Sequence, residues 1–139
     1  MSRADAFTEL NNQDELYSDF LTNMNPHPVS GALLRFINEK AVTRSIRNLI
    51  MTNPGERLYQ PEVGSGIRSL LFEPMSDFTA NTLRKMIEDT ITKYEDRAKV
   101  LNVDVVGEEE SNRYTVTIVY MLINKQDPIS VKVTLQRVR

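Results

Sequence analysis

The sequence predicts an α+β fold: an N-terminal arm and short helices, one long helix, then a three-stranded or slightly larger antiparallel meander sheet. Three observations carry this prediction. The chain has 139 residues, 40% hydrophobic and 26% charged, which is ordinary for one domain with a modest core. Apolar residues recur with helical spacing in the first two thirds and with a period of two thereafter. Helices followed by antiparallel strands are typical of layered α+β folds.

Composition excludes several classes of protein. The net charge of −2 does not favour a nucleic-acid partner, which usually selects a basic surface. The chain has no cysteine, so disulfide scaffolds, thiolate zinc sites and cysteine nucleophiles are excluded. The N-terminus is polar, and the uncharged run Tyr114–Asn124 is too short to cross a bilayer. We expect a soluble, non-secreted protein without a membrane partner.

Residues 1–27 form a predicted polar arm, and residues 28–139 a single α+β domain. Leu10, Tyr17 and Leu21 lie at a spacing that suggests a thin helical stripe within the arm. Two interpretations stay open for this arm, a mobile tail or a segment that orders against a partner. Two prolines around His27 break the chain after it.

The first domain elements are short. Helical spacing of Val42, Ile46, Leu49 and Ile50 predicts a helix over residues 40–51. A Pro-Gly turn ends this helix, a short extended piece is expected over 56–60, and residues 64–66 open a short helix through 70–71.

The long helix is predicted over residues 78–98. Thr79 is its expected N-cap, and Phe78 and Leu83 are then placed for a hydrophobic staple. Its apolar stripe comprises Leu83, Met86, Ile87, Thr90, Ile91 and Tyr94.

Three half-buried strands follow, joined by the short polar links 107–112 and 124–128. Alternation predicts that each strand buries one set of side chains. The three sets are Leu101, Val103 and Val105; Tyr114, Val116, Ile118, Tyr120 and Leu122; and Ile129, Val131, Val133 and Leu135.

The residue types of this sequence give little support to a catalytic function. The single histidine, His27, lies between two prolines, and the glycines fit no phosphate-binding loop. The one catalytic option is a carboxylate pair flanking a glycosidic bond, either Glu73 with Asp77 or Glu56 with Glu62. The chain has no tryptophan to line a sugar site, so an interface role for these acids is favoured.

Residues 95–97 close the long helix with the sequence Glu-Asp-Arg. They are expected to form an exposed charged helix end, where Arg97 suits the negative pole of the helix dipole. Because residues two apart do not face each other on a helix, Glu95 and Arg97 are not expected to pair with each other. Each would then need another partner.

The ordered series of motifs from Ala41 to Pro74 closely resembles the small wedge subunit of contractile-tail baseplates. This family occurs in contractile phages and, in related form, in type VI secretion systems. The resemblance covers roughly residues 28–138. Residues 95–97 are similar to the family's Glu-Pro-Arg signature, with Asp96 in place of the proline. The other motif residues, read as structural, are Arg47, Gly55, Glu56, Arg57, Pro61, Gly64, Phe72, Glu73 and Pro74.

The resemblance implies a structural virion protein of the tail baseplate, assembled in the host cytoplasm and needing no cofactor or metal. Its implied partners are the wedge core proteins, which dock at Glu95, Asp96 and Arg97, the tail sheath protein and, as a further candidate, a peptidoglycan-binding-like wedge neighbour. Its sheet is implied to template the first sheath ring. No stable homo-oligomer is expected outside the baseplate.

The proposed sheath contact is an edge strand that accepts an added strand, comprising Ile129, Val131, Lys132, Val133 and Leu135. Lys132 and Arg137 would keep this edge from self-pairing. An ordinary lysine-protected edge without any partner remains the alternative. Family members have also carried a lysozyme label, so a tail-associated murein hydrolase is the alternative function.

Overall fold

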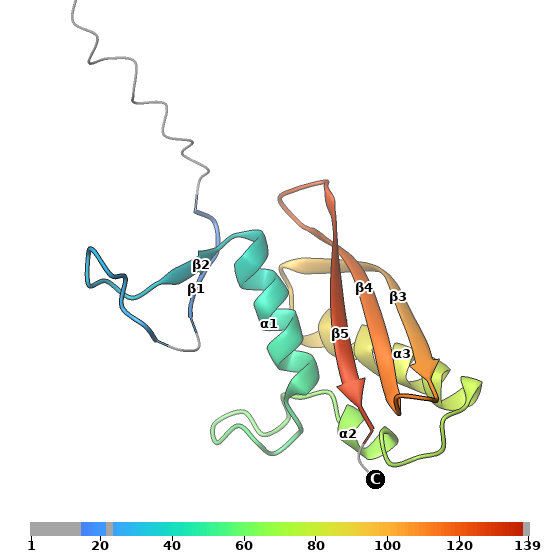
Figure 1. Ribbon diagram of the computed structural model, residues 1–139. Helices are drawn as coiled ribbons and strands as arrows, with labels where there is room; N and C mark the ends of the chain where they lie inside the picture. Colours follow the sequence, from blue (N-terminus) through green and yellow to red (C-terminus); the bar gives the residue numbers. More distant parts are fainter. Residues whose placement is uncertain (1–14, 22–23, 138–139) are drawn as a thin grey trace, which may run out of the picture. The chain divides into compact units, whose positions relative to one another are not determined.

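The computed structural model describes residues 15–21 and 24–137 (Figure 1). The chain divides into two compact units, residues 1–41 and 42–139, whereas the sequence placed a boundary after residue 27. The predicted α+β class and its three-stranded antiparallel sheet are confirmed. Within the described ranges, no helix is long and apolar enough to cross a membrane.

The first unit is built on a small antiparallel pair. Strand β1 (Ser18–Phe20) pairs with β2 (Arg35–Ile37). An isolated bridge joins Pro26 to Leu33 between them. Residues 26–33 therefore fold back on themselves.

Asn38 fixes the start of β1. Its side-chain Oδ1 accepts the backbone N–H of Leu16 (2.9 Å), and its own N–H donates to Tyr17 O (2.7 Å). The predicted helical stripe through Tyr17 and Leu21 is wrong, because both residues flank an extended strand. Leu10 lies outside the described residues.

The second unit contains three helices, α1 (Glu39–Met51, which begins in the first unit), α2 (Ile67–Leu70) and α3 (Asp77–Tyr94). All three lie where the sequence places them, but α3 begins and ends differently. Ser76, not Thr79, caps α3 by accepting the Thr79 N–H (3.2 Å). The predicted staple is also wrong, since Phe78 is 78% exposed.

The main sheet is a meander of β3 (Ala98–Glu108), β4 (Arg113–Leu122) and β5 (Pro128–Gln136), in that spatial order. The register of β3 shifts between Val100 and Asn102. Leu101 is the extra residue of this bulge and is half exposed, so its predicted burial is wrong. One inserted residue reverses the side-chain alternation on either side of it.

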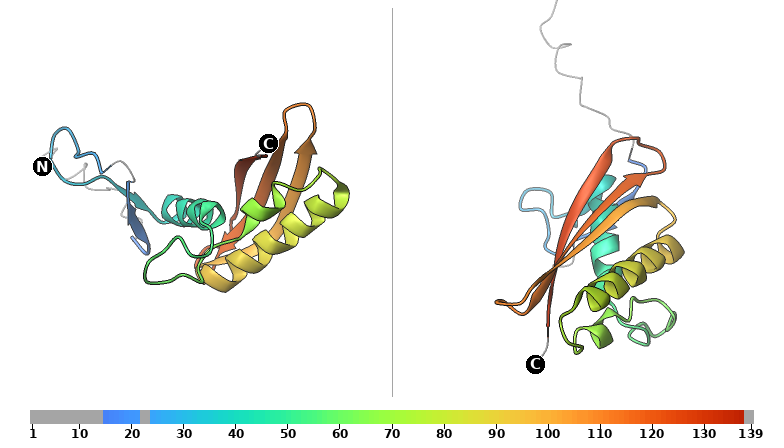
Figure 2. Two further views of the ribbon diagram at one scale, coloured as in Figure 1. Left: turned by 90° about the horizontal axis from the view of Figure 1, so that it is seen from below. Right: turned by 90° about the vertical axis from the view of Figure 1, so that its right-hand side faces the viewer.

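The core lies between one face of this sheet and the helices, which cover the same face (Figure 2). Helix α3 packs along β3. Helix α1 reaches β4, where the hydroxyls of Thr43 and Tyr120 are 2.7 Å apart. The fully buried side chains include Val42, Ile46, Ile67, Leu83, Ile87, Ile91, Val103, Tyr114, Val116, Ile118 and Tyr120.

The connection from α1 to α2 is a closed loop. Residues 57–59 form a bend, and no strand forms over the predicted extended piece at 56–60. Ser65 N–H donates to Thr52 O (3.0 Å), so the two ends of the loop meet. Gly64 (φ 153°) lies directly against the backbone of Asn53 and Pro54, where an added Cβ would come within 2.6 Å of both.

We therefore expect Gly64→Ala to destabilise the protein by about 3 kcal/mol, from backbone strain together with overlap in a closed turn. Gly55→Ala is the matched control, because Gly55 also has positive φ (91°) but an added Cβ there meets nothing within 4 Å. The control should lose only about 1 kcal/mol. Chemical denaturation measures both, and equal losses would contradict the steric account.

Candidate functional site

The site predicted at residues 95–97 is a sharp turn between α3 and β3. Glu95 leaves the helix with φ −125° and ψ 78°, while its N–H still donates to Ile91 O (2.9 Å). Ala98 N–H then donates to Glu95 O (3.2 Å), which closes the turn. The chain therefore reverses within three residues and enters the sheet.

Glu95 and Arg97 form a bidentate ion pair across this turn. Arg97 Nε lies 2.5 Å from Glu95 Oε1, and Arg97 Nη2 lies 2.8 Å from Oε2. The Glu95 side chain is 4% exposed and that of Arg97 35% exposed. The prediction that the two would not pair, on an exposed helix end, is wrong because the helix already ends at Tyr94.

Burial alone would raise the pKa of Glu95. The hydrogen bonds from Arg97 and Ser45 and the charge of Arg97 outweigh that effect, so its pKa lies below the ordinary value. The Glu95 carboxylate is therefore ionised, and it is held by Ser45 from α1 and by Arg97 just before β3. Asp96, which replaces the family's proline, is exposed.

The second predicted site, the β5 edge, has a definite hydrogen-bonding direction. Arg137 N–H donates to Asn112 O (2.9 Å), which continues the β4–β5 ladder. In an antiparallel ladder, alternate residues direct their backbone groups to the partner strand. Counting back from Arg137, the odd-numbered residues of β5 face β4. The residues whose N–H and C=O groups face the free side are Ser130, Lys132, Thr134 and Gln136.

Arg47 confirms this direction, because its Nη2 donates to Lys132 O (3.2 Å) from α1. Arg47, Met51, Lys132, Val133 and Thr134 line an open groove of about 320 Å³ beside the edge. Of the other predicted edge residues, Val131, Val133 and Leu135 are buried in the core and Ile129 is half-buried. These side chains pack β5 against the core, while the N–H and C=O groups of its even-numbered residues face the free side.

The motif residues between α1 and α3 are mostly exposed. Gly55, Glu56, Arg57, Pro61 and Gly64 belong to the closed loop. Phe72, Glu73 and Pro74 follow α2, with Phe72 59% exposed and Pro74 O accepting the Thr79 hydroxyl (3.0 Å). The structure therefore does not bring this set together at one site.

The described residues give no support to a sugar-cleaving site at the predicted carboxylate pairs. Glu56 accepts hydrogen bonds from the Asn53 backbone and side chain, which lower its pKa, whereas a general acid needs a raised one. Asp77 lines a hollow of about 290 Å³ at the start of α3, but its predicted partner Glu73 does not.

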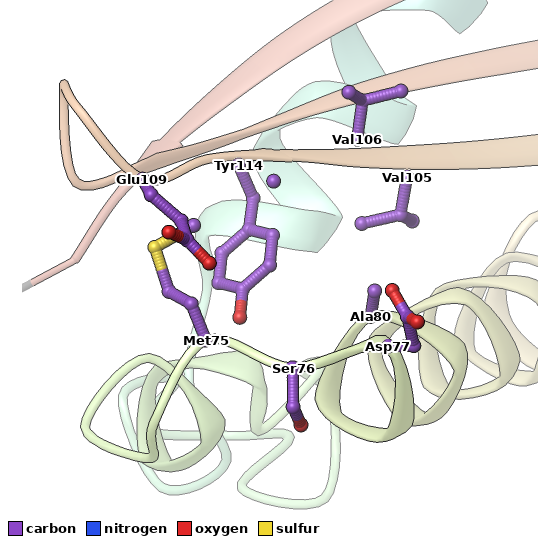
Figure 3. Close-up of a pocket in the computed structure, with 9 residues that line it drawn as sticks. Met75, Ser76, Asp77, Ala80, Val105, Val106, Glu109 and Tyr114 are labelled. Carbon is purple, nitrogen blue, oxygen red and sulfur yellow. The ribbon is translucent and has the colours of Figure 1, made fainter.

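The carboxylate opposite Asp77 in this hollow is Glu109, from the β3–β4 turn (Figure 3). Tyr114 stands between them, with its hydroxyl pointing toward Ser76 and without a hydrogen-bond partner among the described residues. Burial raises the pKa of Tyr114. Among the residues that the structure places, no group of three or more His, Cys, Asp or Glu side chains gathers for a metal ion.

Sequence reasoning missed three residues, one at the turn of residues 95–97 and two in the closed loop. Ser45 hydrogen-bonds Glu95 from α1, although nothing in the helical spacing marks it. Leu58 and Tyr59 are 94% and 97% exposed, and their position between Gly55 and Pro61 was the available signal.

Removing Arg97 should destabilise the protein, because Arg97→Ala leaves the Glu95 carboxylate buried without its cation. We expect a loss of about 2 to 3 kcal/mol, somewhat less than for a fully buried pair because Arg97 is partly exposed. Asp96→Ala, at the exposed middle residue, should change stability by less than about 0.5 kcal/mol. Thermal and chemical unfolding measure both, and an unchanged Arg97→Ala protein would refute the structural role.

The ion pair of Glu95 and Arg97 should also make the unfolding free energy depend on pH. A carboxylate whose pKa is lower in the folded state contributes stability above its unfolded value, and that stability is lost as pH falls through the folded pKa. Unfolding free energy should therefore fall below about pH 4.5. Glu95→Gln should flatten this dependence, whereas Glu110→Gln in the exposed turn should not. Denaturation at pH 7, 5, 4 and 3 compares the slopes, and identical slopes for wild type and Glu95→Gln would contradict the assignment.

Comparison with known proteins places this arrangement in one family. The residue profile of "Baseplate wedge protein gp25" matches residues 38–127. Baseplate wedge protein gp25 of Enterobacteria phage T4 is 30% identical over 118 residues, 85% of this chain and 89% of that protein.

Solved structures share the fold at lower identity. A putative tail lysozyme of Geobacter sulfurreducens superposes with a TM-score of 0.68 at 22% identity, covering 73% of this chain and 92% of its own. A chain of the anti-feeding prophage baseplate gives a TM-score of 0.61 at 20% identity, covering 88% and 87%. A chain of the type VI secretion system baseplate complex gives 0.55 at 16%, covering 68% and 91%. At these identities the likeness shows the fold alone, whereas the profile and the phage T4 relative show the family: the chain belongs to the gp25 family of baseplate wedge proteins, structural components of contractile tails.

Proposed function

We propose that this chain is a non-enzymatic wedge subunit of a contractile-tail baseplate that starts the first ring of sheath by adding a sheath strand to β5. The observation that carries the proposal is the free β5 edge with its ladder of outward backbone groups. Assembly takes place in the host cytoplasm, and the subunit then stays in the tail baseplate.

The β5 edge suits strand addition better than the opposite edge of the sheet. The register of β5 against β4 runs without a shift from Pro128 to Gln136, so its outward groups are evenly presented. The other edge, β3, carries the bulge at Leu101, and bulges interrupt pairing. A strand added at β5 would bond Ser130, Lys132, Thr134 and Gln136, and main-chain bonds supply the affinity in this kind of recognition.

Arg47 shields this edge before assembly. Its guanidinium occupies the Lys132 carbonyl, one of the acceptors that an added strand would use. An incoming backbone N–H would replace that contact and free the guanidinium for an acidic side chain of the added strand. Together with the charge of Lys132, this contact discourages edge-to-edge pairing of free subunits, so we expect no stable homo-oligomer outside the baseplate.

The turn at residues 95–97 is the proposed docking point for the wedge core proteins. The ion pair of Glu95 and Arg97 fixes the turn and leaves Asp96 and part of Arg97 exposed. Docking on a pre-formed turn avoids the cost of ordering it during assembly. The tail sheath protein, the wedge core proteins and a peptidoglycan-binding-like wedge neighbour are the proposed partners.

No observation favours the murein hydrolase alternative. Its four candidate acids, Glu56, Glu62, Glu73 and Asp77, are all exposed, and the pKa of Glu56 is lowered by the hydrogen bonds from Asn53, whereas a general acid needs a raised one. The hollow that Asp77 lines holds a different carboxylate, Glu109, in place of the predicted partner Glu73.

Strand addition can be tested with a single proline. Thr134 directs its N–H to the free side, so Thr134→Pro removes an outward donor without removing a bond to β4. The variant should fold with a melting temperature within about 5 °C of wild type. In tail-producing cells that carry it as their only copy, baseplates should form but full-length sheath should be reduced at least about tenfold, as counted in electron micrographs.

Thr134→Ala is the matched control, because it shortens the same side chain and keeps the N–H. It should support sheath at the wild-type level. Wild-type amounts of sheath on a folded Thr134→Pro subunit would overturn strand addition at β5.

A further inference from the structure

The loop between α1 and α2 is held in one shape by its own hydrogen bonds. Gly55 N–H donates to Pro61 O (2.7 Å) across the loop. The Glu56 carboxylate accepts the Asn53 N–H (3.0 Å) and the Asn53 amide (2.6 Å). Val63 N–H donates to Gln60 O (3.1 Å). The loop is thus closed at its ends by the Ser65–Thr52 hydrogen bond and across its middle by the Gly55–Pro61 hydrogen bond, which leaves it few alternative conformations.

This fixed loop displays apolar side chains to solvent. Leu58 and Tyr59 are 94% and 97% exposed, the highest values among the large apolar side chains that the structure describes. Together with Arg57 they line one shallow surface at the tip. The fold gains nothing from this exposure, because neither apolar side chain packs against the core. Tyrosine and arginine are also the residue types that dominate binding energy at protein interfaces.

The charges of Glu56 and Arg57 indicate the chemistry of a partner surface that would bind this loop. Glu56 is engaged by Asn53 and lies 3.9 Å from Arg68, so its charge is already compensated. Arg57 makes no ion pair with any residue in the described ranges. A partner surface would therefore offer an apolar pocket for Leu58 and Tyr59 with a carboxylate at its rim for Arg57.

The loop is tied to the end of α3. The Tyr94 hydroxyl donates to Glu62 O (2.6 Å), and Tyr94 directly precedes Glu95. Through Tyr94, the loop that carries Arg57, Leu58 and Tyr59 is therefore linked to the turn at residues 95–97, the proposed docking point. A protein that docks at this turn would reach the base of the loop.

We propose that Arg57, Leu58 and Tyr59 form a second docking contact, which inserts into an apolar pocket with an acidic rim on another baseplate protein. The inference rests on the proposed function, because it requires the chain to be built into a baseplate. A second copy of this chain and a lipid surface are the competing occupants.

Photocrosslinking in assembled baseplates tests the occupant. Benzoylphenylalanine in place of Tyr59 should crosslink, in purified baseplates, to a different baseplate chain, at a peptide rich in apolar residues with Asp or Glu. The same probe in place of Phe78, which is 78% exposed at the start of α3, should give a different adduct or none. A crosslink from position 59 to a second copy of this chain, to lipid, or to nothing would overturn the proposal.

Affinity tests the chemistry of the contact. Leu58→Ser with Tyr59→Ser should lower incorporation into baseplates, in competition with wild-type chain, by at least about 30-fold, a loss typical of hot-spot residues. Arg57→Glu should lower incorporation more than Arg57→Ala, because it places like charges together. Since all three side chains are exposed, melting temperatures should stay at the wild-type value. Equal incorporation of the double variant and wild type would sink the proposal.

The outcomes separate this inference from the proposed function. If the Leu58 and Tyr59 variant enters baseplates and starts sheath normally, only the second docking contact fails. If wild-type chain is absent from purified baseplates, the proposed function fails as well.

Discussion

The ion pair between Glu95 and Arg97 is the interaction on which the arrangement of the larger unit depends. It lies where the long helix must end and the sheet must begin, and it holds that reversal in three residues. Ser45 adds a hydrogen bond from α1, so one buried carboxylate joins α1 and the end of α3 to the start of β3. A buried charge of this kind stabilises only while all its partners are present, which makes it a strict geometric constraint. The position of β3, and through it of β4 and β5, follows from this turn.

The one-sided sheet is the second constraint. Among the residues that the structure describes, the helices of the second unit cover one face of the three-stranded sheet, and β3 and β5 are its two edge strands. The two edges are treated differently, since β3 carries a bulge and β5 carries the Arg47 contact at Lys132. A bulge interrupts regular pairing where it lies, whereas a side-chain contact on one carbonyl is exchangeable. This asymmetry supports the proposal that a partner strand adds to β5 rather than to β3.

Most of the fold was predictable from periodicity, because the buried faces of α1, α3, β4 and β5 repeat cleanly. The errors arose where one residue changes the period or ends an element. Leu101 looked like a core residue because a bulge has no sequence signature separate from alternation. Thr79 looked like the cap, but Ser76 lies where the helix starts, and a cap is fixed by backbone geometry. Glu95 and Arg97 looked unable to pair because the helix was extended to Ala98. The exposure of Leu58 and Tyr59 depends on long-range closure of a loop, which no local pattern reports.

Cryo-electron microscopy of the intact baseplate and first sheath ring that carry this chain is the most direct test of strand addition at β5. If a sheath strand adds to this edge, its density should pair with β5 through Ser130, Lys132, Thr134 and Gln136, with Arg47 withdrawn from the Lys132 carbonyl. A β5 edge left bare in the assembled tail would contradict it. So would a subunit at the puncturing tip with Asp77 facing an open groove.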